Sequence, residues 1–444
     1  MRPAPLALLP ILLLASASTR AEEMTEHHGH TKSMPESSGD DWTTRTAPML
    51  MPLRMMIPGD WAPPGGYHFM GNFAAIATNP GFSNAYDPGL GRTHPYLLAD
   101  WAMVQGRTAN GYLEGMLMLN FEAITFSREG WYEIGQAGEG LSDRQHQHQL
   151  LHQALIAFHV LGREEGAMKV TLFAGQGSAT IGPPVFMHRA SNPSPTVPRK
   201  HHKGENPHET FPVIGGTFEY LATALDLSVF SAYEFGPDDS RLYPRVRAPK
   251  SYAARVRQRL WKTVELQVSG ERLNDQGDRY VQLLPGAPIT NEGPEEDAVQ
   301  LSASIYGRFT GAFVLDGLLD WAVDRPVHRE AGGHGAAYSW LVEAAVRSLS
   351  LRDVAWMRAE VNDRIEADES LGRRWLFGTL GYEHVVWVDP QSVFGVGVFS
   401  EITAVRVPLA VSDAYGKRWG ATTTIGLHGQ WMTMGGSHAG HHGM

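Results

Sequence analysis

Polar and apolar residues alternate one by one along most of the chain from Tyr67 onward. The segments TVELQVSGE (263–271) and VQLSASIYGR (299–308) show this pattern without interruption. A period of two is that of a β-strand, because successive side chains of a strand point to opposite faces of the sheet. The pattern therefore predicts a series of strands, each with one polar face and one apolar face.

Sixteen segments of this kind follow one another, with almost no helical periodicity between them. The predicted strands cover residues 67–77, 97–107, 111–125, 150–161, 167–177, 213–223, 226–236, 251–261, 263–273, 298–309, 312–324, 336–348, 353–365, 375–388, 392–405 and 418–432. The connections between the strands alternate in length along the whole chain. Long connections such as 126–149 and 178–212 alternate with short ones such as TAN and TGA.

This alternation of loop lengths decides between two β architectures. An even number of strands, with short turns at one end and long loops at the other, is typical of an outer-membrane β-barrel with periplasmic turns and extracellular loops. An array of β-sandwich domains would also alternate, but it has no reason to keep one rim short over sixteen strands. We therefore predict an all-β fold, a transmembrane antiparallel β-barrel of about 16 strands over residues 67–432, in the bacterial outer membrane.

Three arginines occupy alternate positions in the segment YAARVRQRLW, namely Arg255, Arg257 and Arg259. An arginine that faces lipid near the bilayer midplane costs about 2–4 kcal/mol, so we expect all three to line a water-filled lumen. The following strand brings Glu265 and Glu271 to the same side. These five side chains are predicted to be pore-lining, and opposite charges can meet there across neighbouring strands.

The first 21 residues, MRPAPLALLPILLLASASTRA, have the features of a secretory signal peptide: an early arginine, a short apolar run and then small residues. The apolar run is too short to span a bilayer as a helix, and no later run approaches the roughly 20 apolar residues that a membrane helix needs. The sequence thus predicts an exported protein without a helical anchor.

Composition narrows the possible partners further. The formal net charge of −10 argues against nucleic acid as a partner. The chain contains no cysteine, which excludes both a disulfide framework and a thiolate metal site.

Histidine and methionine concentrate at both ends of the mature chain. The candidate metal ligands are Met24, His27, His28, His30 and Met34 in the N-terminal segment 22–66, and His438, His441, His442 and Met444 in the C-terminal tail 433–444. Imidazole and thioether groups suit copper better than magnesium or calcium, so we predict that the two tails capture copper. An even strand count places both tails on the periplasmic side. The alternative is that they are disordered polar tails without a ligand role.

The barrel wall offers a second group of candidate ligands. If alternation holds, the side chains of His68, Met70, Met103, Met116 and Met118 point inward from three neighbouring strands. Methionine is unusual on a lumen face, which is polar in most barrels of this kind. The alternative is that the segment 22–66 forms a plug, against which these methionines pack as gap-fillers.

One loop carries a resemblance to known proteins. The segment GPPVFMHRAS (182–191), the histidine pair that follows it and the segment GGTFEYLATALDLSVFSAYEFGPDDSR (215–241) resemble a family of proteobacterial outer-membrane proteins without an assigned activity. The resemblance covers the region of all the predicted strands and implies an outer-membrane barrel with a link to copper. In composition alone the chain is similar to outer-membrane copper-resistance barrels.

The sequence offers no enzymatic motif: it has neither a Gly-x-Ser-x-Gly nucleophile elbow nor a phosphate-binding glycine loop. We therefore expect a barrel that is not an enzyme and that binds or passes a small solute, linked to copper handling. The expected partners are outer-membrane lipid, a metal ion or small solute, and the outer-membrane assembly machinery, because the last strand closes on an aromatic residue, Trp431. The alternatives are a general diffusion porin without a metal role and a structural or interaction barrel.

Overall fold

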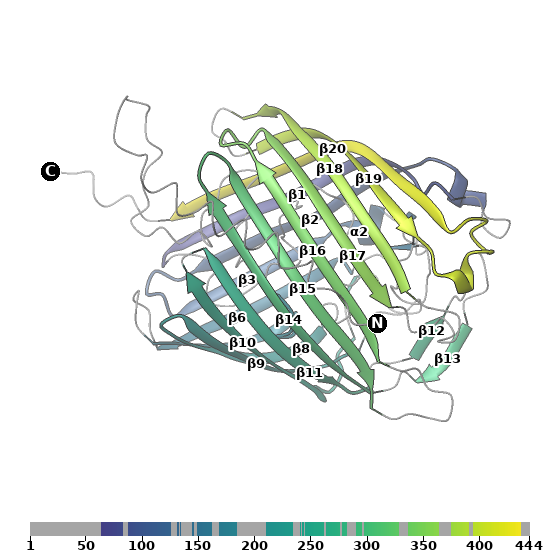
Figure 1. Ribbon diagram of the computed structural model, residues 1–444. Helices are drawn as coiled ribbons and strands as arrows, with labels where there is room; N and C mark the ends of the chain where they lie inside the picture. Colours follow the sequence, from purple (N-terminus) through teal and green to yellow (C-terminus); the bar gives the residue numbers. More distant parts are fainter. Residues whose placement is uncertain are drawn as a thin grey trace.

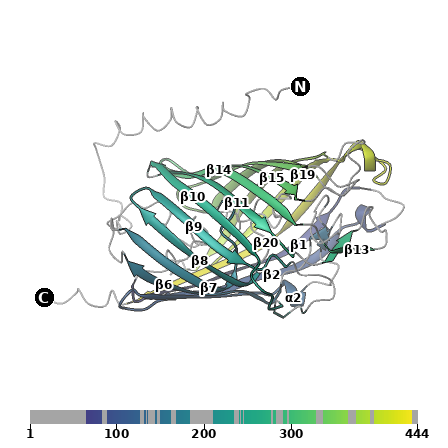
Figure 2. The ribbon, with the colours of Figure 1, turned by 90° about the horizontal axis from the view of Figure 1, so that it is seen from below.

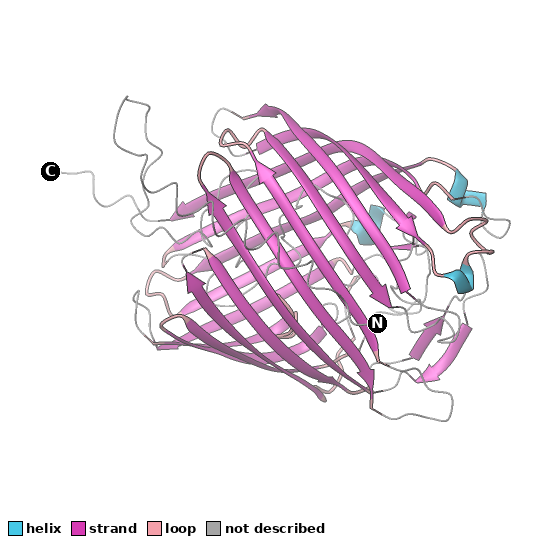
Figure 3. Ribbon diagram, in the orientation of Figure 1, coloured by secondary structure: helices cyan, strands magenta, loops and turns pink. Residues whose placement is uncertain are grey.

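Sixteen antiparallel strands close into a single barrel in the computed structural model (Figure 1). The structure describes residues 64–82, 88–125, 131–132, 134, 144–145, 149–161, 168–183, 210–233, 240, 242–243, 245–261, 263–275, 278–281, 290–294, 297–327, 336–363, 374–389 and 394–436. Figure 3 shows how completely strands dominate the described part of the chain. The predicted fold class and the predicted number of strands are therefore confirmed.

The barrel strands follow one another around the wall in chain order. They are β1 (Gly66–Asn79), β2 (His94–Arg107), β3 (Leu113–Asn120), β6 (Leu151–Leu161), β7 (Lys169–Gly177), β8 (Thr210–Tyr220), β9 (Thr223–Phe230), β10 (Ser251–Trp261), β11 (Val264–Leu273), β14 (Ala298–Thr310), β15 (Val314–Pro326), β16 (Ala337–Arg347), β17 (Asp353–Asp363), β18 (Arg374–Val388), β19 (Phe394–Arg406) and β20 (Trp419–Gly436). Pairing of β1 with β20 closes the wall and removes every open edge.

Short turns and long connections lie at opposite ends of the barrel, as the loop rhythm predicts. Gly66 pairs with Gly436, so β1 begins and β20 ends at the rim of the short turns. The long connections contain the remaining elements, of which Figure 2 shows β13 and α2 at one end of the barrel. These elements are η2 (Pro88–Gly91), α2 (Glu122–Thr125), β4 (Trp131–Tyr132), β5 (Arg144–Gln145), β12 (Asp278–Val281), β13 (Thr290–Pro294) and η5 (Leu409–Val411). The sequence pattern did not predict the small hairpins β4–β5 and β12–β13.

Each strand presents an apolar face to the outside and, over most of the wall, a polar face to the inside. On β10, Tyr252 and Val256 are 58 % and 48 % exposed, whereas Arg255 and Arg257 are 5 % and 1 % exposed. A closed barrel with an apolar exterior leaves no backbone hydrogen-bonding group facing lipid, so such a wall can span a bilayer.

Most strand ends differ from their predicted positions by a few residues, and three of these differences affect the interior. The predicted strand 111–125 stops at Asn120, whose side-chain oxygen accepts a hydrogen bond from the backbone N–H of Glu122 at 2.8 Å and turns the chain into α2. The last strand continues past Trp431 to Gly436, because β1 still offers it pairing partners.

The third difference is the turn between β8 and β9. It consists of Leu221 and Ala222, with Leu221 in the left-handed region at φ 53°, whereas the pattern placed the turn between residues 223 and 226. The earlier turn makes Asp226 a fully interior position of β9.

No helix in the part of the chain that the structure describes is long and apolar enough to cross a membrane. The predicted signal peptide, the segment 22–63, the tail 437–444 and most of the long loop 178–212 lie outside the described residues.

Candidate functional site in the barrel interior

Charged residues cover the interior faces of β9 to β11 and of β14 to β17. We name this surface the ionic wall. Its charged members are Asp226, Arg255, Arg257, Arg259, Glu265, Glu271, Arg308, Asp316, Asp320, Glu343, Arg347, Arg358 and Glu360. Alternation within each strand turns these side chains inward, and the register between strands decides which of them meet.

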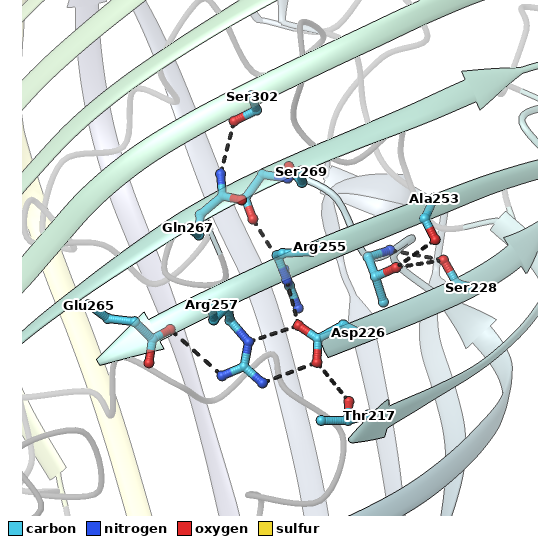
Figure 4. Close-up of polar contacts among 12 residues, drawn as sticks. Thr217, Asp226, Ser228, Ala253, Arg255, Arg257, Glu265, Gln267, Ser269 and Ser302 are labelled. Carbon is cyan, nitrogen blue, oxygen red and sulfur yellow. Dashed lines mark hydrogen bonds and ion pairs between the residues drawn. The ribbon is translucent and has the colours of Figure 1, made fainter. Parts of the chain in front are cut away.

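Asp226 on β9 is the central partner of the arginines on β10 (Figure 4). Its Oδ2 accepts hydrogen bonds from the Nε atoms of Arg255 and Arg257, both at 2.8 Å. Its Oδ1 accepts from Nη2 of Arg257 at 3.1 Å and from the hydroxyl of Thr217 at 2.9 Å. Arg257 also lies 3.6 Å from Glu265 on the other side. Two arginines thus face two carboxylates, and this part of the wall is electrically compensated.

Direct cross-strand partners form two further ion pairs of the ionic wall. Arg308 on β14 stands opposite Asp316 on β15 and donates two hydrogen bonds to its carboxylate, at 2.6 and 3.0 Å. Arg358 on β17 stands opposite Glu343 on β16, at 3.8 Å, and lies 3.1 Å from Glu360. The charges of this wall are therefore largely engaged with one another.

The connection that follows β7 begins inside the barrel, bonded to the ionic wall. The backbone N–H and the hydroxyl of Thr180 contact Oγ of Ser228, at 3.1 and 2.9 Å. The N–H of Gly182 donates to Oγ of Ser269 at 2.9 Å, and its carbonyl accepts from Arg255 at 3.1 Å. Gly182 has φ +67°, a backbone conformation that residues with a side chain rarely adopt. The start of this loop therefore narrows the interior at β9 to β11.

The same segment has an apolar side. Ala179 and Ile181 are buried and belong to an interior apolar cluster that also contains Leu155, Phe173 and Val213. Polar residues of the segment thus bond to one part of the wall, and the apolar residues between them pack into the cluster. This two-sided attachment fixes the direction in which the loop leaves β7.

Five methionines cluster on the interior faces of β20, β1, β2 and β3. We name this surface the methionine wall. Its members are Met70, Met103, Met116, Met118 and Met432, all at most 5 % exposed. Met70 is the direct cross-strand partner of both Met432 and Met103. Met103 in turn pairs with Met118, so four thioethers form one row across four adjacent strands.

A second row lies beside the first and contains His68, Gln105 and Met116 as direct cross-strand partners. Nε2 of Gln105 lies 3.6 Å from the sulfur of Met103 and 3.3 Å from the sulfur of Met116. The amide therefore lies against one thioether of each row. Thioether sulfur is a weak hydrogen-bond acceptor. These contacts therefore leave the sulfur lone pairs available to a soft metal ion.

The structure brings together only some of the residues that the sequence pattern singles out. Arg255, Arg257, Glu265 and Glu271 are buried on the interior face, and Arg259 is half-buried at the register position of Glu265. The candidates at the two ends of the chain lie outside the described residues; they are Met24, His27, His28, His30, Met34, His438, His441, His442 and Met444. Within the described ranges, no three His, Asp or Glu side chains gather into a metal-binding group.

Sequence reasoning missed the interior roles of Asp226 and Gln105. The arginines were expected to find partners on the following strand, but the shortest pairs are to Asp226 on the preceding one. Met432 lies on the inward face of β20 together with His428. It falls within the predicted strand 418–432, where alternation gives it this inward direction.

Comparison with known proteins gives likeness of shape only. No family model matches the chain, and neither does any curated protein. Among solved structures, OmpT of Vibrio cholerae has 10 % identity and a TM-score of 0.47, over 83 % of this chain and 98 % of that one. An anion-selective porin from Comamonas acidovorans has 10 % identity and a TM-score of 0.43, with the same coverage. A porin refined at 1.8 Å has 12 % identity and a TM-score of 0.40, over 82 % of this chain and 100 % of that one.

The strand pairing and the distribution of side chains establish the kind of protein without these likenesses. The wall is closed, its exterior is apolar, and its interior carries compensated charges. In a wide barrel this distribution matches lipid outside and a polar interior. The protein is a porin-like β-barrel of the bacterial outer membrane.

Proposed function

We propose that the barrel binds and passes a small solute, and that this solute is copper in its reduced form, Cu(I). The observation that carries the proposal is the row of Met432, Met70, Met103 and Met118, which register places side by side on the interior wall. Direct cross-strand neighbours have Cβ atoms about 4.5–5.5 Å apart. Flexible thioethers at that spacing can share one soft ion.

Ligand chemistry supports copper over other metals. Thioether sulfur selects Cu(I), whereas magnesium and calcium require oxygen ligands. The five methionines are uncharged. A singly charged ion needs less compensation of its charge from the protein than a divalent ion does. The half-buried imidazole of His68 adds a nitrogen ligand beside Gln105 in the second row. The histidine- and methionine-rich ends of the chain would capture the ion on the periplasmic side.

Packing is the alternative role for these methionines. Methionine fills irregular space in apolar cores, and all five sit in the same apolar cluster as Trp101 and Phe173. A packing role and a ligand role differ in one property. Leucine replaces methionine in packing at a cost of usually less than about 1.5 kcal/mol, but it removes the sulfur altogether.

The test is a Cu(I) titration of the full-length protein in detergent against a chromophoric competitor. The wall variant carries Met70→Leu and Met103→Leu. The matched control carries Met168→Leu and Met357→Leu, two methionines that are 40 % and 52 % exposed. We expect the wall variant to lose at least about tenfold in affinity for one equivalent of Cu(I), because two adjacent soft ligands are removed, and the control to match the wild type. Equal titration curves for all three proteins would refute the copper proposal.

A general diffusion porin is the second candidate, and the inward start of the β7–β8 connection favours it. Thr180 and Gly182 bond to the ionic wall and narrow the interior next to Arg255. A constriction lined by fixed charges selects solutes by size and charge without any metal. Single-channel conductance in planar bilayers, recorded with and without Cu(I), separates the two functions. A porin conducts chloride or potassium with no response to copper.

A further inference from the structure

A carboxylate and an imidazole face each other on the interior wall near the short turns. Glu114 lies one residue after the start of β3, and His159 lies near the end of β6. Both side chains are buried, at 0 % and 2 % exposure. Nε2 of His159 is 3.6 Å from Oε2 of Glu114. This distance exceeds that of a hydrogen bond, so the two groups do not bond to each other directly.

The atoms that face each other lack other partners as well. Among the described residues, neither oxygen of Glu114 and not Nε2 of His159 has a hydrogen-bond partner. A buried carboxylate without hydrogen bonds is strongly unfavourable. Arg107 compensates part of the charge, because its Nε lies 3.6 Å from Oε1. Its guanidinium, however, donates its hydrogen bonds to the carbonyl of Gly111. The oxygen that faces the imidazole is left to another partner.

We propose that Glu114 and His159 bind a divalent transition-metal ion, with Zn²⁺ as the representative case. Bonds from zinc to imidazole nitrogen and to carboxylate oxygen measure about 2.0–2.2 Å. Two such bonds span the observed 3.6 Å separation at an angle of about 114–128°, close to the trigonal value. One ion between Oε2 and Nε2 would give both atoms their partner without moving either strand.

The other nitrogen of the ring is already held in a suitable way. Nδ1 of His159 lies 3.2 Å from the hydroxyl of Thr171 on β7. With Nδ1–H donating to this hydroxyl, Nε2 carries a lone pair and points to Glu114. Contacts of this kind fix the tautomer and the orientation of metal-binding histidines. Two protein ligands leave further coordination positions to water, as expected for a site that an ion enters and leaves.

This site is distinct from the methionine wall although the two adjoin. Glu114 and Met116 are successive inward residues of β3, so the oxygen–nitrogen site lies beside the second row, on the side of the short turns. Zinc prefers imidazole and carboxylate to thioether. A zinc titration therefore tests Glu114 and His159 independently of whether the methionines bind Cu(I).

The experiment is a Zn²⁺ titration by calorimetry of the full-length protein in detergent, with His159→Gln and Glu114→Gln as separate variants. The matched control is His428→Gln, which removes a buried interior imidazole whose Nδ1 bonds to Glu383 at 3.0 Å. We expect both site variants to lose the same single equivalent of Zn²⁺ and the control to keep it. Heat-modifiable mobility, a difference in gel migration between heated and unheated samples, checks that each variant is folded.

Anomalous diffraction at the zinc edge from wild-type crystals gives a readout that needs no variant. A peak between Glu114 and His159 is the expected result. Zinc stoichiometry unchanged in both site variants, or a map without a peak at this position, would overturn the proposal and leave a water molecule or a shared proton between the two groups.

Discussion

The two interior walls of the barrel fill the space inside it with opposite kinds of side chain. The ionic wall fills the inside with charges and pairs them, so that Asp226 alone accepts hydrogen bonds from two arginines. The methionine wall fills the inside with long uncharged side chains, in which Met70 and Met103 are direct neighbours. Both walls have the same strand alternation and the same register rules. The difference in chemistry between the two walls therefore comes from their residue types.

The two walls also differ in how firmly their side chains are held. Buried ion pairs are stable only when their charges are compensated, and that compensation holds the arginines of the ionic wall in fixed positions. The sulfurs of Met103 and Met116 make weak polar contacts with the amide of Gln105. The ionic wall is thus suited to shape and rigidity, and the methionine wall to reversible binding.

The largest expected effect comes from breaking the ionic wall at its centre. Asp226→Asn leaves Arg255 and Arg257 buried without their shared carboxylate. Removing one partner of a buried pair typically costs about 3–5 kcal/mol, so we expect a loss of that size in the free energy of unfolding. Equilibrium urea unfolding in lipid vesicles measures it. Met118→Leu in the methionine wall is the contrast, with an expected loss below about 1.5 kcal/mol. Similar losses in both variants would contradict the distinction between the walls.

Crowding the outside of the methionine wall has the next largest effect. A Cβ at Gly71 would lie 2.2 Å from the ring of Trp431 and 2.5 Å from the carbonyl oxygen of Trp101. Gly71→Ala should therefore cost about 1–3 kcal/mol of unfolding free energy, as overpacking does. Gly115→Ala on β3 is the matched control, because nothing lies within 4 Å of its added Cβ. The same urea unfolding experiment compares the two, and equal stability would exclude tight packing at Gly71.

Much of the difference between the walls could be predicted from the sequence, because alternation is a local property. The number of strands and the shared face of Arg255 and Arg257 follow from a period of two. The inward direction of Met70 and Met103 follows in the same way. Each of these predictions needs only neighbouring residues along one strand.

The partners of these residues could not be predicted, because partners depend on register. Asp226 meets Arg255 only because the preceding turn is at Leu221, a residue type that gives no signal for the left-handed conformation it adopts. The attachment of Gly182 to Ser269 joins residues 87 positions apart. Nothing local to either residue indicates that contact.

The inward loop should be held by hydrogen bonds that are worth less than the buried ion pairs. The double variant Ser228→Ala and Ser269→Ala removes the hydroxyls that contact Thr180 and Gly182. Each hydrogen bond contributes about 1 kcal/mol, so the loop is expected to loosen without unfolding of the barrel. Planar-bilayer recordings should show a larger and noisier conductance than that of the wild type. A matched control, Ser350→Ala in the turn between β16 and β17, should leave the recordings unchanged, and an unchanged double variant would rule out a constriction at this place.

The smallest effect is expected where the same kind of ion pair lies in water. Nζ of Lys250 is 2.5 Å from Asp275 at the rim of the long loops, and the two side chains are 56 % and 47 % exposed. The hydrogen bond from Lys250 lowers the pKa of the Asp275 carboxyl. The pair therefore contributes stability above the ordinary pKa of an aspartate, near about 4, and loses it as the pH falls through the lowered value. Exposed pairs contribute between about 0 and 1 kcal/mol and are screened by salt.

Lys250→Ala should accordingly change the unfolding free energy by less than about 1 kcal/mol at neutral pH, and by less still in about 1 M salt. Urea unfolding at two salt concentrations measures both quantities, with Asp226→Asn as the reference, whose loss should persist in salt because the pair is buried. The distance of the rim pair is shorter than those around Asp226. If distance alone decided stability, Lys250→Ala would be the more damaging of the two variants. Burial and the number of uncompensated charges left behind predict instead that Asp226→Asn costs more.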